Sequence, residues 1–161
     1  MERLRVPAGI AGALAVAAVV AGTALGGSSA FVAKYSGTVT EKVNGQQVTA
    51  VPRGKGTGTP IGKSTLTGVV KATTANPPCS PLNGPGTLAG AKGKLQLSLL
   101  PTSRGCAASE EDKDNVSFSG SAKVIGGTGK FRGAKGTLRF SGHYDRAGGT
   151  FNVKLSGTIK H

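Results

Sequence analysis

Residues 54–64, GKGTGTPIGKS, end in a Gly-Lys-Ser triplet that suggests phosphate chemistry. A P-loop requires the pattern G-x-x-x-x-G-K-[ST] between a buried strand and a helix. The position that needs the first glycine is Thr57, and the residues after Ser64, TLTGVV, are rich in β-branched side chains and indicate a strand. Without a helix N-terminus, the dipole and the free N–H groups that hold phosphates are missing. The sequence therefore predicts no P-loop, and we expect no cofactor.

The two cysteines, Cys79 and Cys106, are the next candidates for chemistry. An even pair of cysteines in an exported chain is typical of a disulfide. A metal site needs more than two ligands, and His143 and His161 lie far off in sequence without ligand-like spacing. We predict a Cys79–Cys106 disulfide worth about 3 kcal/mol by the loop-entropy model, and no metal site.

Three ionisable side chains, Tyr35, Glu41 and Tyr144, fall on strand faces that are otherwise apolar. They are the candidate catalytic groups, because they are the polar handles that an enzyme orienting an apolar substrate would have on this face. Glu41 stands near a strand end beside the Asn44-Gly45 turn, so we expect it to point into solvent at the rim. No Ser-His-Asp set is recognisable, since His143 falls on the predicted outer face.

Charge is the strongest compositional signal. The 161 residues include 20 Lys and Arg against 7 Asp and Glu, a net charge of +13. Residues 31–161 alone hold 18 basic and 6 acidic residues, a net charge of +12. Such a charge favours anionic partners such as a cell-surface polymer, although a merely solvated basic surface explains it equally well. The aromatic side chains fall on the face opposite the lysines, so we predict no nucleic-acid binding.

Four of the acids gather in residues 110–114, EEDKD. Carboxylates are calcium ligands, but this run lacks the regular ligand spacing and the closing glutamate of an EF-hand loop. We predict a solvated loop.

The first thirty residues resemble an export signal. A basic start, MERLR, precedes a mostly Ala, Val and Gly stretch at residues 6–25, and Ser28-Ser29-Ala30 supplies small residues for a peptidase. The alternative is a retained membrane anchor, since the stretch is nearly long enough to span a bilayer. We predict cleavage after Ala30, a secreted protein with no membrane span after cleavage, and one domain over residues 31–161.

The elements that position these residues are strands. Apolar and polar side chains alternate with period two, the mark of a half-buried strand. The segments are residues 34–43, 64–71, 94–100, 115–125, 137–145 and 150–160, with a shorter run at 46–52 that pairs back across Asn44-Gly45. Without helices, the apolar faces must cover one another in a barrel or a sandwich. Glycines inside the strands suit barrel bends, so we predict an all-β, antiparallel barrel of about eight strands.

The disulfide constrains the middle of the chain. An unbroken strand over residues 86–100 would separate its ends by roughly 46 Å at about 3.3 Å per residue, too far for Cys79 to reach Cys106. A turn at residues 90–93, GAKG, makes a hairpin and brings both cysteines to one end. The hairpin and the disulfide are therefore one prediction.

Residues 126–136, GGTGKFRGAKG, resemble the G-G-T-G-x-[FY]-x-x-A-x-G signature of the allene oxide cyclase and dirigent barrels. The matching positions are Gly126, Gly127, Thr128, Gly129, Phe131, Ala134 and Gly136. A dinucleotide fingerprint fails here, because Arg132 stands where a glycine is needed and no helix follows. The resemblance implies an eight-stranded, calycin-like barrel in which this stretch is a turn between two strands.

The resemblance also suggests chemistry. Allene oxide cyclases cyclise a fatty-acid epoxide in an apolar lumen, and dirigent proteins orient phenoxy radicals. None of the three candidate groups matches a family catalytic position, so no catalytic role is carried over.

Three functions remain open. The first is a non-enzymatic exported module whose lumen is filled or binds a small apolar ligand. The second is an isomerase- or cyclase-like enzyme that orients an apolar substrate. The third is a protein that binds a cell-surface or other polyanion through its basic exterior.

Overall fold

The structure, a computed structural model, describes residues 27–75 and 77–161. Almost all of the predicted signal peptide lies outside these residues. The strands are β1 (Ser28–Asn44), β2 (Gln47–Thr59), β3 (Gly62–Gly68), β4 (Val70–Thr73), β5 (Cys79–Pro81), β6 (Pro85–Gly90), β7 (Gly93–Leu99), β8 (Arg104–Ala107), β9 (Asn115–Gly127), β10 (Lys135–Asp145) and β11 (Thr150–Lys160), with a short 3-10 helix, η1 (Gly129–Phe131). In the described part of the chain, no helix is long and apolar enough to span a membrane.

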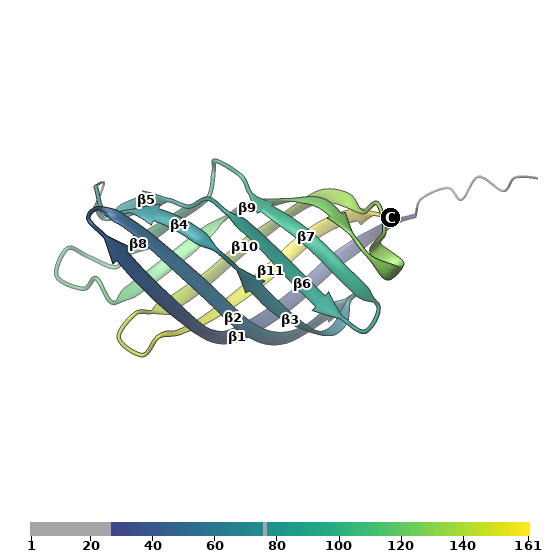
Figure 1. The fold of residues 1–161 in the computed structure, drawn as a ribbon, viewed down its shortest axis with the longest axis horizontal. Coiled ribbons are helices and arrows are strands. Elements are labelled where there is room, and N and C mark those ends of the chain that lie inside the picture. The colour runs from purple at the N-terminus through teal and green to yellow at the C-terminus, as the bar shows by residue number, and fades with distance from the viewer. Residues whose placement is uncertain (1–26, 76) are drawn as a thin grey trace, which may run out of the picture.

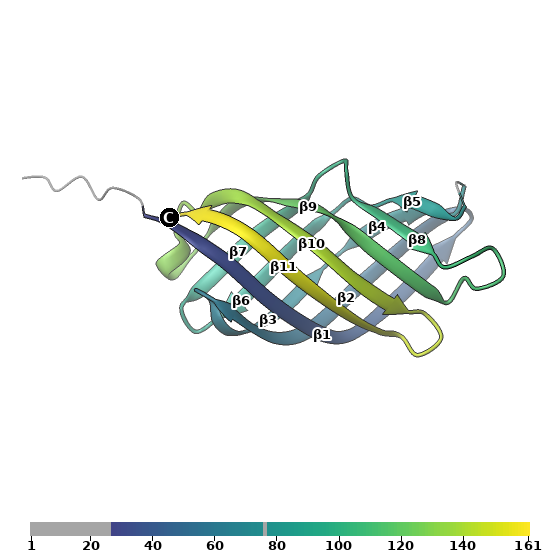
Figure 2. The same ribbon diagram turned by 180° about the vertical axis from the view of Figure 1, so that it is seen from behind.

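The strands close into a barrel, as Figures 1 and 2 show. Around the wall the order is β1, β2, β3, β6, β7, β9, β10 and β11, and β11 returns to β1 through a register from Ser28↔Lys160 to Thr38↔Thr150. Every pairing is antiparallel. The predicted all-β, eight-stranded barrel is confirmed, and closure leaves no unpaired edge along these strands.

Three short strands lengthen the wall at one end. β4 continues β3 and pairs with the start of β2, while β5 and β8 pair with each other and β8 pairs with the first half of β9. The predicted strand over residues 64–71 is thus interrupted at Val69. The Val69 N–H donates to the carbonyl of Pro85 (3.0 Å). The α-carbon of Gly84, which has a φ of +136°, lies against the carbonyl of Val69. Only glycine adopts that φ at so close an approach.

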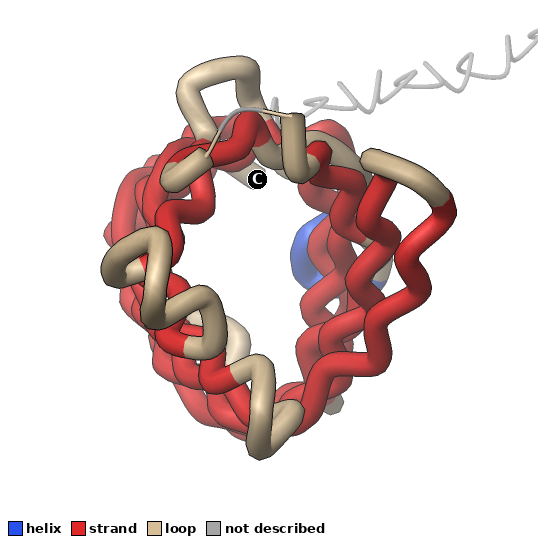
Figure 3. Tube along the Cα trace, turned by 90° about the vertical axis from the view of Figure 1, so that its left-hand side faces the viewer, coloured by secondary structure: helices blue, strands red, loops and turns tan. Residues whose placement is uncertain are grey.

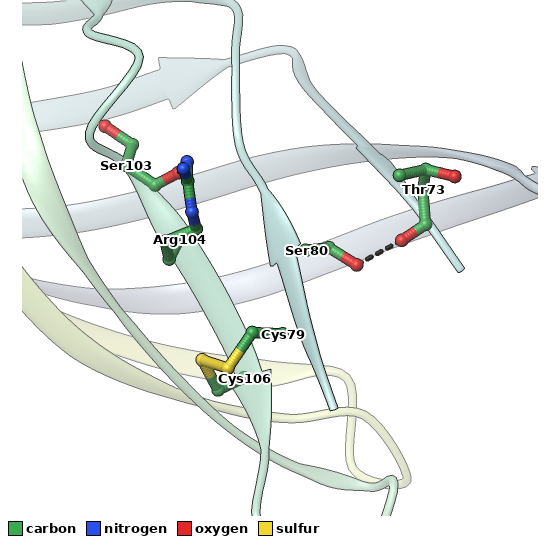
Figure 4. Close-up of a disulfide and its surroundings, with 6 residues drawn as sticks. All are labelled: Thr73, Cys79, Ser80, Ser103, Arg104 and Cys106. Atoms are coloured by element: carbon green, nitrogen blue, oxygen red, sulfur yellow. Dashed lines mark hydrogen bonds between the residues drawn. A yellow bond between two sulfur atoms is a disulfide. The ribbon is translucent and has the colours of Figure 1, made fainter. Parts of the chain in front are cut away.

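The disulfide joins the short strands β5 and β8. Cys79 lies directly opposite Cys106 in the β5–β8 register, and their sulfur atoms are bonded at 2.11 Å (Figure 4). The opposite end of this hairpin is the β6–β7 turn, where Gly90 faces Gly93. Hairpin and disulfide are both confirmed. The Ser80 hydroxyl, which donates to the carbonyl of Thr73, ties β5 to the end of β4 (Figure 4).

The end of the barrel that holds the C-terminus (Figure 1) is filled with apolar side chains. We call it the closed end. Its fully buried residues are Phe31, Ile61, Leu88, Leu95, Val124, Phe131, Ala134, Leu138 and Ile159. They come from six of the eight wall strands and from the β2–β3 and β9–β10 connections, and they belong to one hydrophobic core cluster.

The glycine-rich motif at residues 126–136 plugs the closed end. It includes the end of β9, η1 and the first residues of β10, and it carries Phe131 and Ala134 into the core at 1% and 0% exposure. At Gly127, any side chain would collide with the carbonyls of Phe131 and Lys94, so only glycine allows the chain to fold back here. The structure thus gives the motif a packing role at the closed end.

Candidate functional site

The other end of the barrel, which we call the open end, holds a cavity of about 430 Å³. Figure 3 views the barrel down its axis from this end. The cavity wall is mainly apolar and includes Val39, Leu66, Leu99, Val116, Phe118, Phe140 and Phe151. Small-molecule sites in proteins have volumes of about 300–1,000 Å³ and mostly apolar walls. The lumen is therefore filled at one end and hollow at the other.

Glu41, Tyr144 and Arg146 line this cavity together. Glu41 lies near the end of β1, Tyr144 near the end of β10, and Arg146 just beyond β10. The Arg146 Nε atom lies 3.2 Å from the Glu41 Oε2 atom in an ion pair. The Glu41 side chain is only 18% exposed. Our expectation that it points into solvent is therefore wrong, because it lines the cavity and pairs with a cation that the sequence did not place beside it.

Arg146 also connects this site to the loop between β8 and β9. Its Nη1 atom donates to the carbonyl of Lys113 at 3.2 Å, and its main-chain N–H donates to the carbonyl of Asp114 at 2.8 Å. Glu110 and Lys113 of the same loop line the cavity. Arg146 thus contacts both a carboxylate on β1 and the loop that precedes β9.

Tyr144 provides a phenol at the same place. It is 9% exposed. Burial raises the pKa of the Tyr144 hydroxyl, the nearby Glu41 carboxylate raises it further, and the Arg146 cation lowers it in part. The group therefore stays protonated at neutral pH and can donate a hydrogen bond. Beside it, Glu41 can only accept and Arg146 can only donate.

Tyr35 lies apart from this group. Its hydroxyl is 2.8 Å from the Ser64 Oγ atom, which in turn donates to the carbonyl of Gly62 at 3.2 Å. Tyr35 is 3% exposed and is absent from the cavity lining. Burial raises the pKa of the Tyr35 hydroxyl, and the hydrogen bond to Ser64 lowers it in part. Ser64, the last residue of the GKS triplet, is therefore a buried hydrogen-bond partner of Tyr35. It lies in β3, where a P-loop would need a helix N-terminus.

Of the three ionisable candidates, the structure brings Glu41 and Tyr144 together and separates Tyr35. Arg146 was missed, although the signal was present: it follows Tyr144 by two residues, the spacing that keeps side chains on one strand face. The strand ends at Asp145 both in the prediction and in the structure, so a count of strand residues alone leaves Arg146 out. The acidic run falls in the β8–β9 loop, where Asp112 accepts hydrogen bonds from Asn115. Residues 27–75 and 77–161 hold no group of three His, Cys, Asp or Glu side chains that could bind a metal.

Comparison with known proteins gives a structural match and no sequence match. No protein family model and no curated protein matches the chain. Among solved structures, the pterocarpan synthase dirigent protein superposes with a TM-score of 0.57 over 92% of this chain and 97% of its own. The fold is dirigent-like. At 12% identity the likeness concerns this dirigent-like fold alone, and it agrees with the dirigent half of the resemblance seen at residues 126–136.

Proposed function

We propose that this dirigent-like barrel binds a small, mainly apolar molecule in the open end of its lumen and holds it in one orientation. The observation that carries the proposal is the 430 Å³ apolar cavity with Glu41, Tyr144 and Arg146 at one place in its lining. Apolar walls supply affinity through burial. A few convergent polar groups fix the ligand's orientation, because a polar atom of the ligand either forms a hydrogen bond with them or remains buried without a partner.

The three polar groups differ in what they accept and donate. A ligand hydroxyl can donate to Glu41, and a ligand carbonyl or carboxylate can accept from Tyr144 or Arg146. In this proposal the barrel acts by orienting its ligand, as a dirigent-like protein does, and a cyclase or isomerase would use the same contacts. The match to a dirigent protein supports orientation over a plain storage role.

We further propose that the protein works outside the cell. The disulfide at residues 79 and 106 fits an oxidising compartment, and the sequence of residues 1–30 resembles an export signal. The ligand would then be a molecule met outside the cytoplasm.

Native mass spectrometry of the exported protein tests the proposal. We expect an added mass that is lost on denaturation, and its value identifies the ligand's composition. For protein without resident ligand, the probe is 1-anilinonaphthalene-8-sulfonate, whose fluorescence rises in apolar sites.

Two tryptophan variants locate the binding. Val116→Trp fills the cavity from its wall, whereas Val32→Trp adds the same side chain to the exposed outer surface, where Val32 is 54% exposed. We expect Val116→Trp to abolish the adduct and the probe signal, and Val32→Trp to keep both. Retention of both in a folded Val116→Trp protein would refute binding in the lumen.

A further inference from the structure

Charge is separated along the barrel axis. All six acidic residues of the described chain lie at or near the open end. They are Glu41, Glu110, Glu111, Asp112, Asp114 and Asp145. Two of them line the cavity, and the rest belong to the β8–β9 loop or to the last residue of β10.

Among the described residues, the Lys, Arg, Asp and Glu side chains at the closed end are all positively charged, and the C-terminal carboxylate of His161 is the one negative group there. The seven cations of the closed end, all exposed, come from the turns and strand ends that cover the filled core. We call them the basic cap: Lys63, Lys92, Lys94, Lys130, Arg132, Lys135 and Lys160. Lys135 and Lys160 even face each other in the β10–β11 register, a like-charge pairing that costs stability.

No Asp or Glu side chain of the described residues neutralises the basic cap, and the C-terminal carboxylate beside Lys160 offsets only one of its seven charges. The one ion pair found in residues 27–75 and 77–161 is Arg146–Glu41, at the opposite end. Lys92 donates to the carbonyl of Pro60 at 2.8 Å, which fixes its position without cancelling its charge. A cluster of exposed cations without acidic side chains nearby raises the local concentration of anions.

Two observations select the kind of anion. The aromatic side chains of the described residues are buried or half-buried, so the basic cap lacks the stacking platform of single-stranded nucleic-acid sites. The chain also enters the barrel at this end. The His161 N–H donates to the carbonyl of Gly27 at 3.3 Å, and the apolar residues 6–25 precede Gly27 in sequence. An export signal in that segment would bring this end of the barrel, and with it the basic cap, nearest to the membrane that the chain crosses.

We propose that the basic cap docks on an anionic phospholipid surface. Lysine and arginine side chains near such a surface are each attracted to its negative potential, and the attraction falls off within a Debye length. Docking by the closed end leaves the cavity facing solution, so the lumen stays accessible while the protein is bound.

Vesicle flotation with the exported protein tests this. The vesicles contain phosphatidylglycerol and phosphatidylcholine, with pure phosphatidylcholine as the lipid control. The cap variant is Lys130→Gln/Arg132→Gln/Lys135→Gln. The wall variant, Lys34→Gln/Lys123→Gln/Lys154→Gln, removes the same charge from exposed mid-strand positions and, like the cap variant, relieves one like-charge pair, Lys34↔Lys154. Circular dichroism and thermal unfolding verify that both variants fold.

We expect the cap variant to bind anionic vesicles about a hundredfold more weakly, from the attraction of three lysine or arginine side chains. The wall variant should lose no more than about fivefold, the attraction of one side chain. Lys34 and Lys154 face each other six residues along β11 from Lys160, about 20 Å, which is beyond a Debye length. Only Lys123, which lies opposite Thr137, is near the closed end. Binding should vanish at high salt.

Three results would overturn the proposal. Equal losses in both variants mean that total charge alone matters. Equal binding to pure phosphatidylcholine means that charge is irrelevant. Cap-dependent binding to soluble dextran sulfate without binding to anionic vesicles assigns the basic cap to a polyanionic glycan instead of a lipid.

Discussion

The two ends of the lumen are built from the same alternating strands and yet differ in content. At the closed end, large side chains such as Phe31, Leu95 and Ile159 meet across the barrel, and the motif at residues 126–136 adds Phe131 as a plug. At the open end, the lining includes small residues, among them Ala50, Gly68, Ala72, Gly105 and Ala107. Alternation therefore decides which side chains face inward, and their size decides whether a barrel is filled or hollow.

Matched phenylalanine truncations test this contrast with the largest expected effect. Phe131→Ala removes a side chain that is 1% exposed and should destabilise the protein by about 3–5 kcal/mol, as for other buried aromatic residues. Phe118→Ala removes a half-buried cavity-lining ring, 6.3 Å from the ring of Phe140, and should cost clearly less. Urea unfolding measures both losses. Equal losses would mean that the open end is as tightly packed as the closed end.

Removing the disulfide should have the next largest effect. Cys79→Ser/Cys106→Ser releases a crosslink between residues 27 apart and should lower the free energy of unfolding by about 3 kcal/mol. Because the bond joins β5 to β8 at the open end, probe binding should weaken while the closed-end core persists. Amide hydrogen exchange distinguishes loosening of β5 and β8 at the open end from loosening of the closed-end core. Faster exchange at Leu95 and Leu138 than in β5 and β8 would contradict this assignment.

Tyr35→Phe tests the buried hydrogen bond between the two ends. Loss of the Tyr35–Ser64 bond should cost about 1 kcal/mol. Because burial raises the pKa of Tyr35 in the folded state, its contribution to stability is complete below the unfolded value, about 10. It is lost as the pH rises from there through the folded pKa. The variant should therefore lose less stability than the parent protein between neutral pH and pH above 10 in urea titrations. An unchanged slope would show that Tyr35 ionises equally in both states.

Glu41→Gln should have the smallest effect on stability and a specific effect on the ligand. The ion pair with Arg146 is partly exposed, so its loss should cost less than about 1 kcal/mol. A ligand hydroxyl that donates to the carboxylate would lose a charged acceptor. Native mass spectrometry should then show a weaker adduct at an almost unchanged melting temperature. An adduct of undiminished affinity would remove Glu41 from the contact. Ala50→Ser, another change in the cavity lining, is the control.

Much of this architecture follows from sequence because each clue acts locally. Period-two alternation assigned Tyr35, Leu95 and Phe151 to the inner face, and Asn44-Gly45 marked the β1–β2 turn, where Asn44 pairs with Gln47. The disulfide implied its hairpin through chain length alone. These inferences needed no knowledge of what lies across the barrel.

The site was harder to predict because it depends on contacts across the lumen. Glu41 and Arg146 are far apart in sequence, and their approach requires β1 and β10 to flank β11 in a closed wall. Turn chemistry suggested a solvated carboxylate at Glu41 and carried no information about its partner. The strand break at Val69 likewise depends on its contact with Gly84, which lies in the connection between β5 and β6 and is distant in sequence.

The pairing of β1 with β11 has a consequence for how the molecule is made. The first strand of the barrel and the last are hydrogen-bonded along eleven residue pairs, so the wall has a gap until the final strand arrives. Sequence-distant pairing of this kind is slow, because loop-closure entropy precedes any gain from contacts. A chain crossing a membrane N-terminus first therefore completes its ring only after residues 150–160 have emerged. Until then β1 presents an open edge, and such a chain depends on its environment to keep that edge from pairing with another molecule.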